Sequence, residues 1–197
     1  AAPSRQFDIS KIDFDLLSRE FAHTRRKNLL LRDLDELVNQ QLSKMLLANP
    51  QRIDYYDRYQ EIIDAYNAEQ NRATIEKTFM DLMELASSLD TEQQRYVREG
   101  FSSDEELSVY DLLFSENLTK QEIETIKKVS VDLLTKIKQQ IAKLDHWTDK
   151  QETKAIVDNL IRNTLWQELP NSYDVNDIQT YQKKIYEYVY MRYPEVA

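Results

Sequence analysis

The sequence predicts an all-α protein. The 197 residues include one glycine and four prolines, whereas glycine alone usually makes up about 7% of a globular chain. Tight turns and β-hairpins depend on glycine, so this composition leaves almost no residues for them. Apolar residues recur at spacings of three and four, which is the period of an amphipathic helix. Since 41% of the residues are hydrophobic, we expect a compact irregular bundle of roughly nine helices with short connectors and no sheet.

Apolar periodicity predicts four helices in the first half of the chain. The basic triplet Arg25-Arg26-Lys27 separates the first helix from the second. Asn49-Pro50 ends the second, because a residue that precedes proline is pushed out of the α region. The expected helices cover residues 8–24, 28–47, 53–67 and 71–88.

Two shorter helices are expected around the single glycine. Gly100 can adopt the positive φ that ends a helix, so it should close a helix over residues 91–99. Ser103 and Glu106 have the spacing of a capping box, in which each side chain binds the backbone near the other. We therefore expect the next helix over residues 103–115.

Three longer helices complete the prediction. Thr119 with Glu122, and Thr148 with Gln151, have the spacing of two further capping boxes. The expected helices cover residues 119–144, 148–166 and 175–192, and the last is rich in tyrosine. We expect residues 11–197 to form a single domain with an internal junction near 98–103. The chain begins Ala-Ala-Pro-Ser without an initiating Met, so we interpret it as a fragment of a larger protein. We interpret residues 1–10 as a linker or as a leading segment that is not native to the protein.

The charge distribution leaves two interpretations open. The formal net charge of −9 disfavours a purely electrostatic nucleic-acid binder. Residues 127–162, however, contain eight basic and five acidic residues. The basic residues form either a solvated surface of mixed charge or a groove that contacts DNA phosphates. The DNA-contact candidates are Lys127, Lys138, Lys143, Lys150, Lys154, Arg162, Lys183 and Lys184.

Several classes of protein are disfavoured. The chain has no cysteine, which excludes a disulfide framework and fits a reducing cytoplasm. No apolar run approaches the roughly 20 residues that span a membrane. No glycine-rich phosphate loop is present, so we expect neither nucleotide hydrolysis nor a bound cofactor.

Two metal-site patterns are weak. Glu20 and His23 have the Glu-x-x-His spacing of di-iron bundles, but such a site needs a second copy, and none is present. Asp149, Glu152 and Lys154 imitate the acidic pair and lysine of Mg²⁺-dependent nucleases. Because all three fall in one expected first helical turn, we favour an electrostatic role at the helix terminus.

The stretch from Arg98 to Leu113 carries a family resemblance. It reads Arg-Glu-Gly-Phe-Ser-Ser-Asp-Glu-Glu-Leu-Ser-Val-Tyr-Asp-Leu-Leu, and Trp147-Thr-Asp-Lys150 follows it later in the chain. Together they resemble the C-terminal helical region of the motor and restriction subunit, HsdR, of type I restriction–modification enzymes. The block that begins Asn49-Pro-Gln-Arg-Ile-Asp-Tyr-Tyr looks most like subfamily IC. The motif residues expected to serve assembly or structure are Arg98, Glu99, Gly100, Ser103, Glu106, Tyr110 and Trp147.

The resemblance implies an accessory role in a bacterial cytoplasmic enzyme. Members of the family have a Mg²⁺-dependent nuclease and two ATP-driven motor domains elsewhere in the subunit, and this chain contains none of those motifs. We therefore expect a non-catalytic domain that helps assembly with the methyltransferase core of modification and specificity subunits, touches the other domains of the motor subunit and contacts the double-stranded DNA backbone. A structural protein-interaction module without DNA contact is the alternative, and an autonomous nuclease using Asp149, Glu152 and Lys154 is a third.

Overall fold

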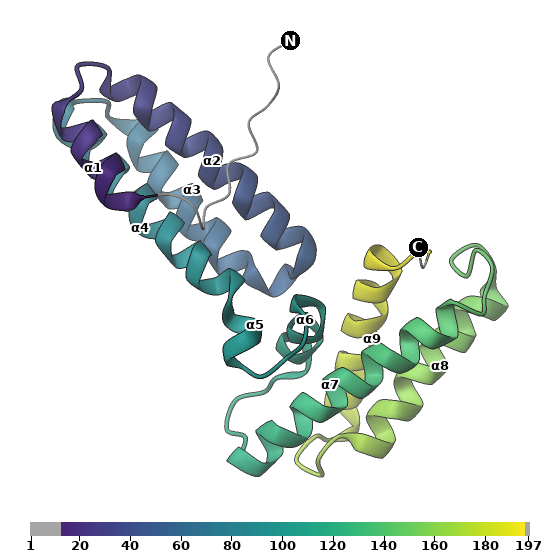
Figure 1. The fold of residues 1–197 in the computed structure, drawn as a ribbon. Helices are drawn as coiled ribbons and strands as arrows, with labels where there is room; N and C mark the ends of the chain where they lie inside the picture. The colour runs from purple at the N-terminus through teal and green to yellow at the C-terminus, as the bar shows by residue number, and fades with distance from the viewer. Residues whose placement is uncertain (1–12, 196–197) are drawn as a thin grey trace. The chain divides into compact units, whose positions relative to one another are not determined.

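The computed structural model describes residues 13–195 and confirms the all-α prediction. These residues form nine α-helices and no strand (Figure 1). Close backbone contacts divide the chain into two compact units, Ala1–Arg95 and Tyr96–Ala197. The boundary falls just before the junction expected near 98–103. The single domain expected over 11–197 stays a prediction, and the lead expected at residues 1–10 lies outside the described residues.

Unit 1 is a helical bundle built around α4. It contains α1 (Phe14–His23), α2 (Lys27–Ala48), a short 3₁₀ helix η2 (Pro50–Arg52), α3 (Ile53–Ala68) and α4 (Arg72–Gln93). Helix α4 packs against both α2 and α3. Phe21 from α1 stacks on Phe79 from α4 with ring centroids 3.7 Å apart. The core also includes Leu31, Leu34, Val38, Leu42, Met45, Leu82, Leu85, Ala86 and Leu89.

A buried charged cluster holds the end of α4 in unit 1. Arg52 is 3% exposed, and its Nε lies 3.1 Å from Oε1 of Glu92. Arg95 Nη2 lies 2.9 Å from the same oxygen. Tyr55 donates a hydrogen bond to Oε2 of Glu92, and burial followed by the nearby carboxylate raises the pKa of this tyrosine. Removing one partner of such a pair would leave a buried charge uncompensated.

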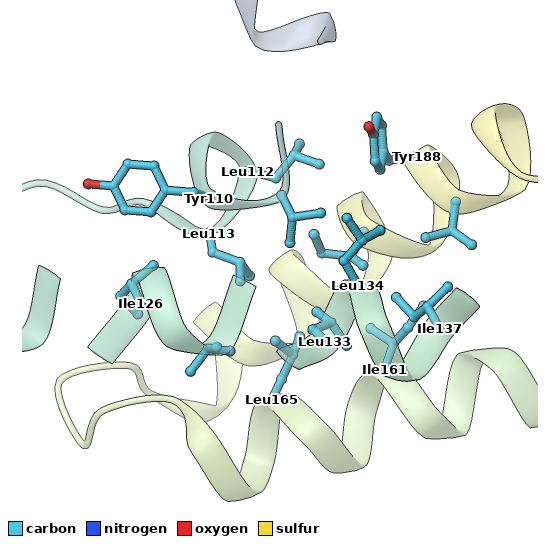
Figure 2. Close-up of a cluster of buried hydrophobic side chains, with 14 of the residues drawn as sticks. Tyr110, Leu112, Leu113, Ile126, Leu133, Leu134, Ile137, Ile161, Leu165 and Tyr188 are labelled. Atoms are coloured by element: carbon cyan, nitrogen blue, oxygen red, sulfur yellow. The ribbon is translucent and has the colours of Figure 1, made fainter. Parts of the chain in front are cut away.

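Unit 2 is a second bundle with its own core. It contains most of α5 (Arg95–Arg98), followed by α6 (Asp104–Leu113), α7 (Lys120–Ile141), α8 (Gln151–Glu168) and α9 (Val175–Arg192). Helix α7 packs against α6 and α8, and α9 packs against α8 and α6. Figure 2 shows apolar side chains from these helices meeting in one cluster. Its labelled members are Tyr110, Leu112, Leu113, Ile126, Leu133, Leu134, Ile137, Ile161, Leu165 and Tyr188.

Gly100 ends α5 in the conformation that the sequence predicts. Its φ is +86°. The Gly100 N–H donates to the Val97 carbonyl (3.1 Å) and the Phe101 N–H donates to the Tyr96 carbonyl (2.9 Å). These two bonds form a Schellman motif, which satisfies carbonyls that a helix end leaves free.

The three expected capping boxes have different outcomes. Thr119 and Glu122 form a complete box at the start of α7. The Ser103 hydroxyl accepts from the Glu106 N–H as expected, but the Glu106 carboxylate accepts from the Ser102 N–H instead of that of Ser103. The box expected at Thr148 is wrong, because α8 begins at Gln151 and its N-cap, Lys150, makes no side-chain capping bond.

The end of α4 also differs from the prediction. A separate helix was expected to begin at Thr91, whereas α4 continues to Gln93. The Thr91 hydroxyl donates back to the Ser87 carbonyl one turn earlier, as a residue inside a helix does. Conversely, Asp174 and Asp177 form a complete capping box at the start of α9 that was not predicted.

Candidate nucleic-acid interface

Two of the eight candidate DNA-contact residues form ion pairs inside unit 2. Lys127 Nζ lies 3.1 Å from Oε2 of Glu99. Lys138 Nζ lies 2.5 Å from Oε2 of Glu105. Both pairs link α7 to the segment that contains Gly100 and α6. Their positive charges are therefore balanced locally, which reduces their attraction for a phosphate.

Glu105 is the centre of a small polar cluster on α6. Besides Lys138, its Oε2 accepts a hydrogen bond from the Tyr193 hydroxyl at 2.8 Å. The Lys138 ammonium also lies 5.4 Å from the centroid of the Tyr193 ring. Burial acts to raise the pKa of Glu105, but the hydrogen bonds from Lys138 and Tyr193 outweigh it and lower this pKa. The cluster joins α6, α7 and the residue that follows α9.

A third lysine of α7 is paired in the same way. Lys136 Nζ lies 2.8 Å from Oδ2 of Asp132 and 3.5 Å from Oε1 of Glu168 at the end of α8. The hydrogen bond to Asp132 raises the pKa of Lys136. Residues 127–138 therefore contribute much less free positive charge than a count of basic residues suggests.

The other candidates extend from the α7–α8 connection along α8 and α9. Lys143, Lys150, Arg162, Lys183 and Lys184 are exposed, and Lys154 is half-buried. Within residues 13–195, none of these six has a carboxylate within ion-pair distance, whereas Lys127, Lys136 and Lys138 do. These six residues are therefore part of the positive charge that unit 2 leaves available to a ligand.

One contact locates part of this charge at the edge between α8 and α9. Gln182 on α9 donates a hydrogen bond to Asp158 on α8 at 3.0 Å. Residues four apart share a helix face, so Lys154 and Arg162 lie one turn before and one turn after Asp158 along this edge. Lys183 is adjacent in sequence to Gln182. We call Lys143, Lys150, Lys154 and Arg162 the α8 basic strip.

Trp147 fixes the α7–α8 connection that carries the first two residues of the strip. Its side chain is completely buried, and its Nε1 donates to the Tyr193 carbonyl at 2.7 Å. Its ring meets those of Tyr186 and Tyr190 edge to face, at centroid distances of 6.1 and 5.8 Å. The tryptophan thus ties the connection to α9, and it explains why α8 begins later than expected.

The other motif residues lie at the start of unit 2. Glu99 and Gly100 line a surface hollow of about 550 Å³ against α7. Ser103 and Glu106 cap α6, as described above. The Tyr110 ring is buried against Phe101 at a centroid distance of 5.4 Å. Arg98 is exposed.

The residues of the two metal-site patterns lie in separate units. Glu20 and His23 line a hollow of about 430 Å³ in unit 1. Asp149 and Glu152 are exposed beside the start of α8 in unit 2. Among residues 13–195, no group of three or more His, Asp or Glu side chains is arranged to hold a metal ion. No helix in this part of the chain has the length and apolar character needed to cross a membrane.

Comparison with known proteins identifies the family of the chain. The sequence profile described as "Type I restriction enzyme HindI endonuclease subunit-like, C-terminal" matches residues 1–193. No curated protein and no solved structure matches the chain. The match does not support the assignment to subfamily IC. Because the profile covers nearly the whole sequence, the chain belongs to the family of C-terminal regions of type I restriction enzyme endonuclease subunits.

Proposed function

We propose that this chain is a non-catalytic domain of the endonuclease subunit. It helps the subunit join the methyltransferase core of modification and specificity subunits, and it contacts the DNA backbone without reading sequence during ATP-dependent translocation and cleavage. ATP and Mg²⁺ act in other domains of the subunit. The observation that carries the DNA contact is the α8 basic strip, whose four cations have no ion-pair partner in the described part of the chain.

The charge of the molecule suits a local, non-specific contact. Lys and Arg side chains bind phosphates and release counterions, without information from the bases. The net charge of −9 opposes DNA binding elsewhere on the surface. A short strip inside an acidic protein therefore favours a weak contact in a defined orientation over tight binding.

The salt dependence of DNA binding tests this proposal. Lys150→Gln with Lys154→Gln should lower the slope of log affinity against log salt by about 1.8, since each lost phosphate contact removes about 0.9. The measurement is fluorescence anisotropy of a short labelled duplex titrated with the 197-residue chain.

A matched control removes two lysines that are already paired. Lys127→Gln with Lys138→Gln removes the same formal charge, but these ammonium groups are balanced by Glu99 and Glu105. This control should leave the slope nearly unchanged. Equal slopes for the two double variants would contradict a specific role for the α8 basic strip.

A protein-interaction module without DNA contact is the second candidate. Exposed apolar side chains on α8 and α9 favour it: Ile156 is 43%, Trp166 49% and Met191 80% exposed. Tryptophan is enriched among residues that dominate binding energy at protein interfaces. This candidate predicts no salt-dependent DNA binding by the chain, so the same titration separates the two functions.

A further inference from the structure

The densest positive charge of the chain lies in unit 1, whereas the α8 basic strip lies in unit 2. Residues 19–32 contain five Arg or Lys residues and one acidic residue. They span the end of α1, the short connector at residues 24–26 and the start of α2. No feature of the function proposed above involves this segment. Arg19, Arg25 and Arg26, which we call the basic turn, are all exposed.

Local hydrogen bonds define the backbone of the connector. The Thr24 N–H donates to the Glu20 carbonyl at 2.9 Å, which closes α1. The Thr24 hydroxyl then accepts from the Arg26 N–H at 3.1 Å. These bonds hold the backbone of the connector between the two helices in one conformation. The side chains of Arg25 and Arg26 therefore extend from a fixed backbone.

Lys27 holds this connector against the core and is not part of the exposed charge. Its ammonium donates to the Phe21 carbonyl at 2.7 Å and lies 4.4 Å from the centroid of the Phe21 ring. Phe21 in turn stacks on buried Phe79. Lys27 is therefore committed to structure, whereas Arg25 and Arg26 point their charge to solvent.

The exposed arginines have no internal counterion in the described part of the chain. Among residues 13–195, no carboxylate lies within ion-pair distance of Arg19, Arg25 or Arg26, whereas the arginines of α4 and its end pair with Glu76 and Glu92. The first turn of α2 also lacks an acidic residue. The positive end of its dipole therefore adds to the arginines instead of being neutralised.

The adjoining hollow sets a limit on where an anion can bind. Arg26 and His23 line it together with the carboxylates of Glu20 and Asp33 and the apolar side chains of Leu29 and Leu30. The two carboxylates would repel a phosphate placed inside the hollow. A polyanion would instead meet the exposed side chains of Arg25 and Arg26 from outside the hollow, and this favours a backbone running past the turn over a small anion bound in a pocket.

We infer that the basic turn is a second contact for the phosphate backbone of double-stranded DNA. The inference rests on the proposed DNA role and extends it to unit 1. Arginine suits this ligand because its planar guanidinium offers paired donors to phosphate oxygens. Charge complementarity selects the ligand. A duplex presents closely spaced phosphates, and here three exposed arginines have no ion-pair partner among residues 13–195 of an acidic chain.

The test compares two double variants of the 197-residue chain. Arg25→Gln with Arg26→Gln should lower the salt slope of duplex binding by about 1.8. The control, Lys44→Gln with Arg58→Gln, removes the same charge from exposed positions on α2 and α3 of the same unit. It should leave the slope near that of the unsubstituted chain. Thermal unfolding followed by circular dichroism confirms that both variants fold.

Each outcome decides the inference. A lower slope for the basic-turn variant alone supports it. Equal slopes for the basic-turn variant and its control overturn it, even if Lys150→Gln with Lys154→Gln still lowers the slope and so upholds the contact in unit 2. Duplex binding without any salt dependence in the unsubstituted chain overturns both proposals, and the arginines are then available to an acidic protein surface instead.

Discussion

Gly100 shows how one residue determines where a helix of unit 2 ends. Its φ of +86° is unfavourable for any residue with a Cβ atom. A Cβ built on Gly100 meets no atom within 4 Å. The requirement for glycine is therefore purely conformational, and packing places no limit on this position.

A substitution at Gly100 is expected to show this conformational cost in isolation. Gly100→Ala should lower the free energy of unfolding by about 1 kcal/mol, the cost of a left-handed conformation for an L-residue. Gly100→Asn should lose less, because asparagine tolerates this conformation better. Urea unfolding of the three proteins is the measurement. A larger loss for asparagine than for alanine would show that space, and not backbone conformation, limits the site.

At the scale of elements, a pair of carboxyl groups joins α7 to the end of α8. Glu168 Oε2 is buried and has no hydrogen-bond donor among the described residues. Burial, followed by the hydrogen bond to Asp132, raises the pKa of Glu168. The hydrogen bond with Glu168, followed by that from Lys136, lowers the pKa of Asp132. The pKa values of the two carboxyl groups are thus shifted in opposite directions, that of Glu168 upward and that of Asp132 downward.

Glu168→Gln should change how stability depends on pH. The folded-state pKa of Glu168 is raised above its usual value of 4.5. The stabilisation that protonation of Glu168 gives the folded state is therefore complete below that pH. It is lost as the pH rises through the raised pKa. Glutamine keeps a hydrogen-bond donor at every pH. The unfolding free energy of the unsubstituted protein should therefore fall relative to that of the variant as the pH rises from 4.5 through the raised pKa of Glu168.

Urea unfolding at a series of pH values provides the measurement. Glu152→Gln serves as the control, because it removes one negative charge from an exposed position of the same helix. A difference between Glu168→Gln and the unsubstituted protein that stays constant with pH would contradict the raised pKa of Glu168.

Local signals predicted the elements, and long-range contacts explain the errors. Periodicity located the helices, and the spacing of Thr119 and Glu122 identified the start of α7. The start of α8 was misplaced because Trp147 bonds to Tyr193, 46 residues away. No pattern near Thr148 reveals that bond. Similarly, α4 passes through Thr91 to Gln93, and Glu92 in its last turn bonds to Arg52, 40 residues away.

The candidate interface was predictable only in part for the same reason. The sequence indicates a basic bias between residues 127 and 162, and the α8 basic strip lies within it. The pairing of Lys138 with Glu105 spans 33 residues and carries no periodic signature. Counting charges therefore gave paired and unpaired lysines equal weight. The basic turn was visible as Arg25-Arg26-Lys27, but only the structure separates the two exposed arginines from the lysine bound to Phe21.

At the scale of the whole molecule, both units are acidic. The sequence of unit 1 contains 13 basic and 17 acidic residues, and that of unit 2 contains 13 basic and 18 acidic residues. Neither unit can therefore bind DNA through its overall charge. Contact with phosphates must use local groups such as the α8 basic strip and the basic turn, while the remaining surface is available to protein partners.

Deleting this chain from the complete endonuclease subunit should weaken assembly with the methyltransferase core. ATP hydrolysis by the truncated subunit alone should persist, because the proposed function places the motor residues in other domains. Size-exclusion chromatography of the mixed subunits measures assembly, and the ATPase assay shows that the truncated subunit is folded. Assembly of the truncated subunit with unchanged affinity would contradict the proposed role.

The position of Trp147 has a spectroscopic consequence. The chain contains two tryptophans, and both lie in unit 2: Trp147 is fully buried against α9, and Trp166 is 49% exposed. Unit 1 contains tyrosines but no tryptophan. Emission excited at the red edge of the tryptophan band therefore arises only from unit 2. Added iodide should quench Trp166 and spare Trp147, so unit 2 can be followed in the intact chain without an attached dye.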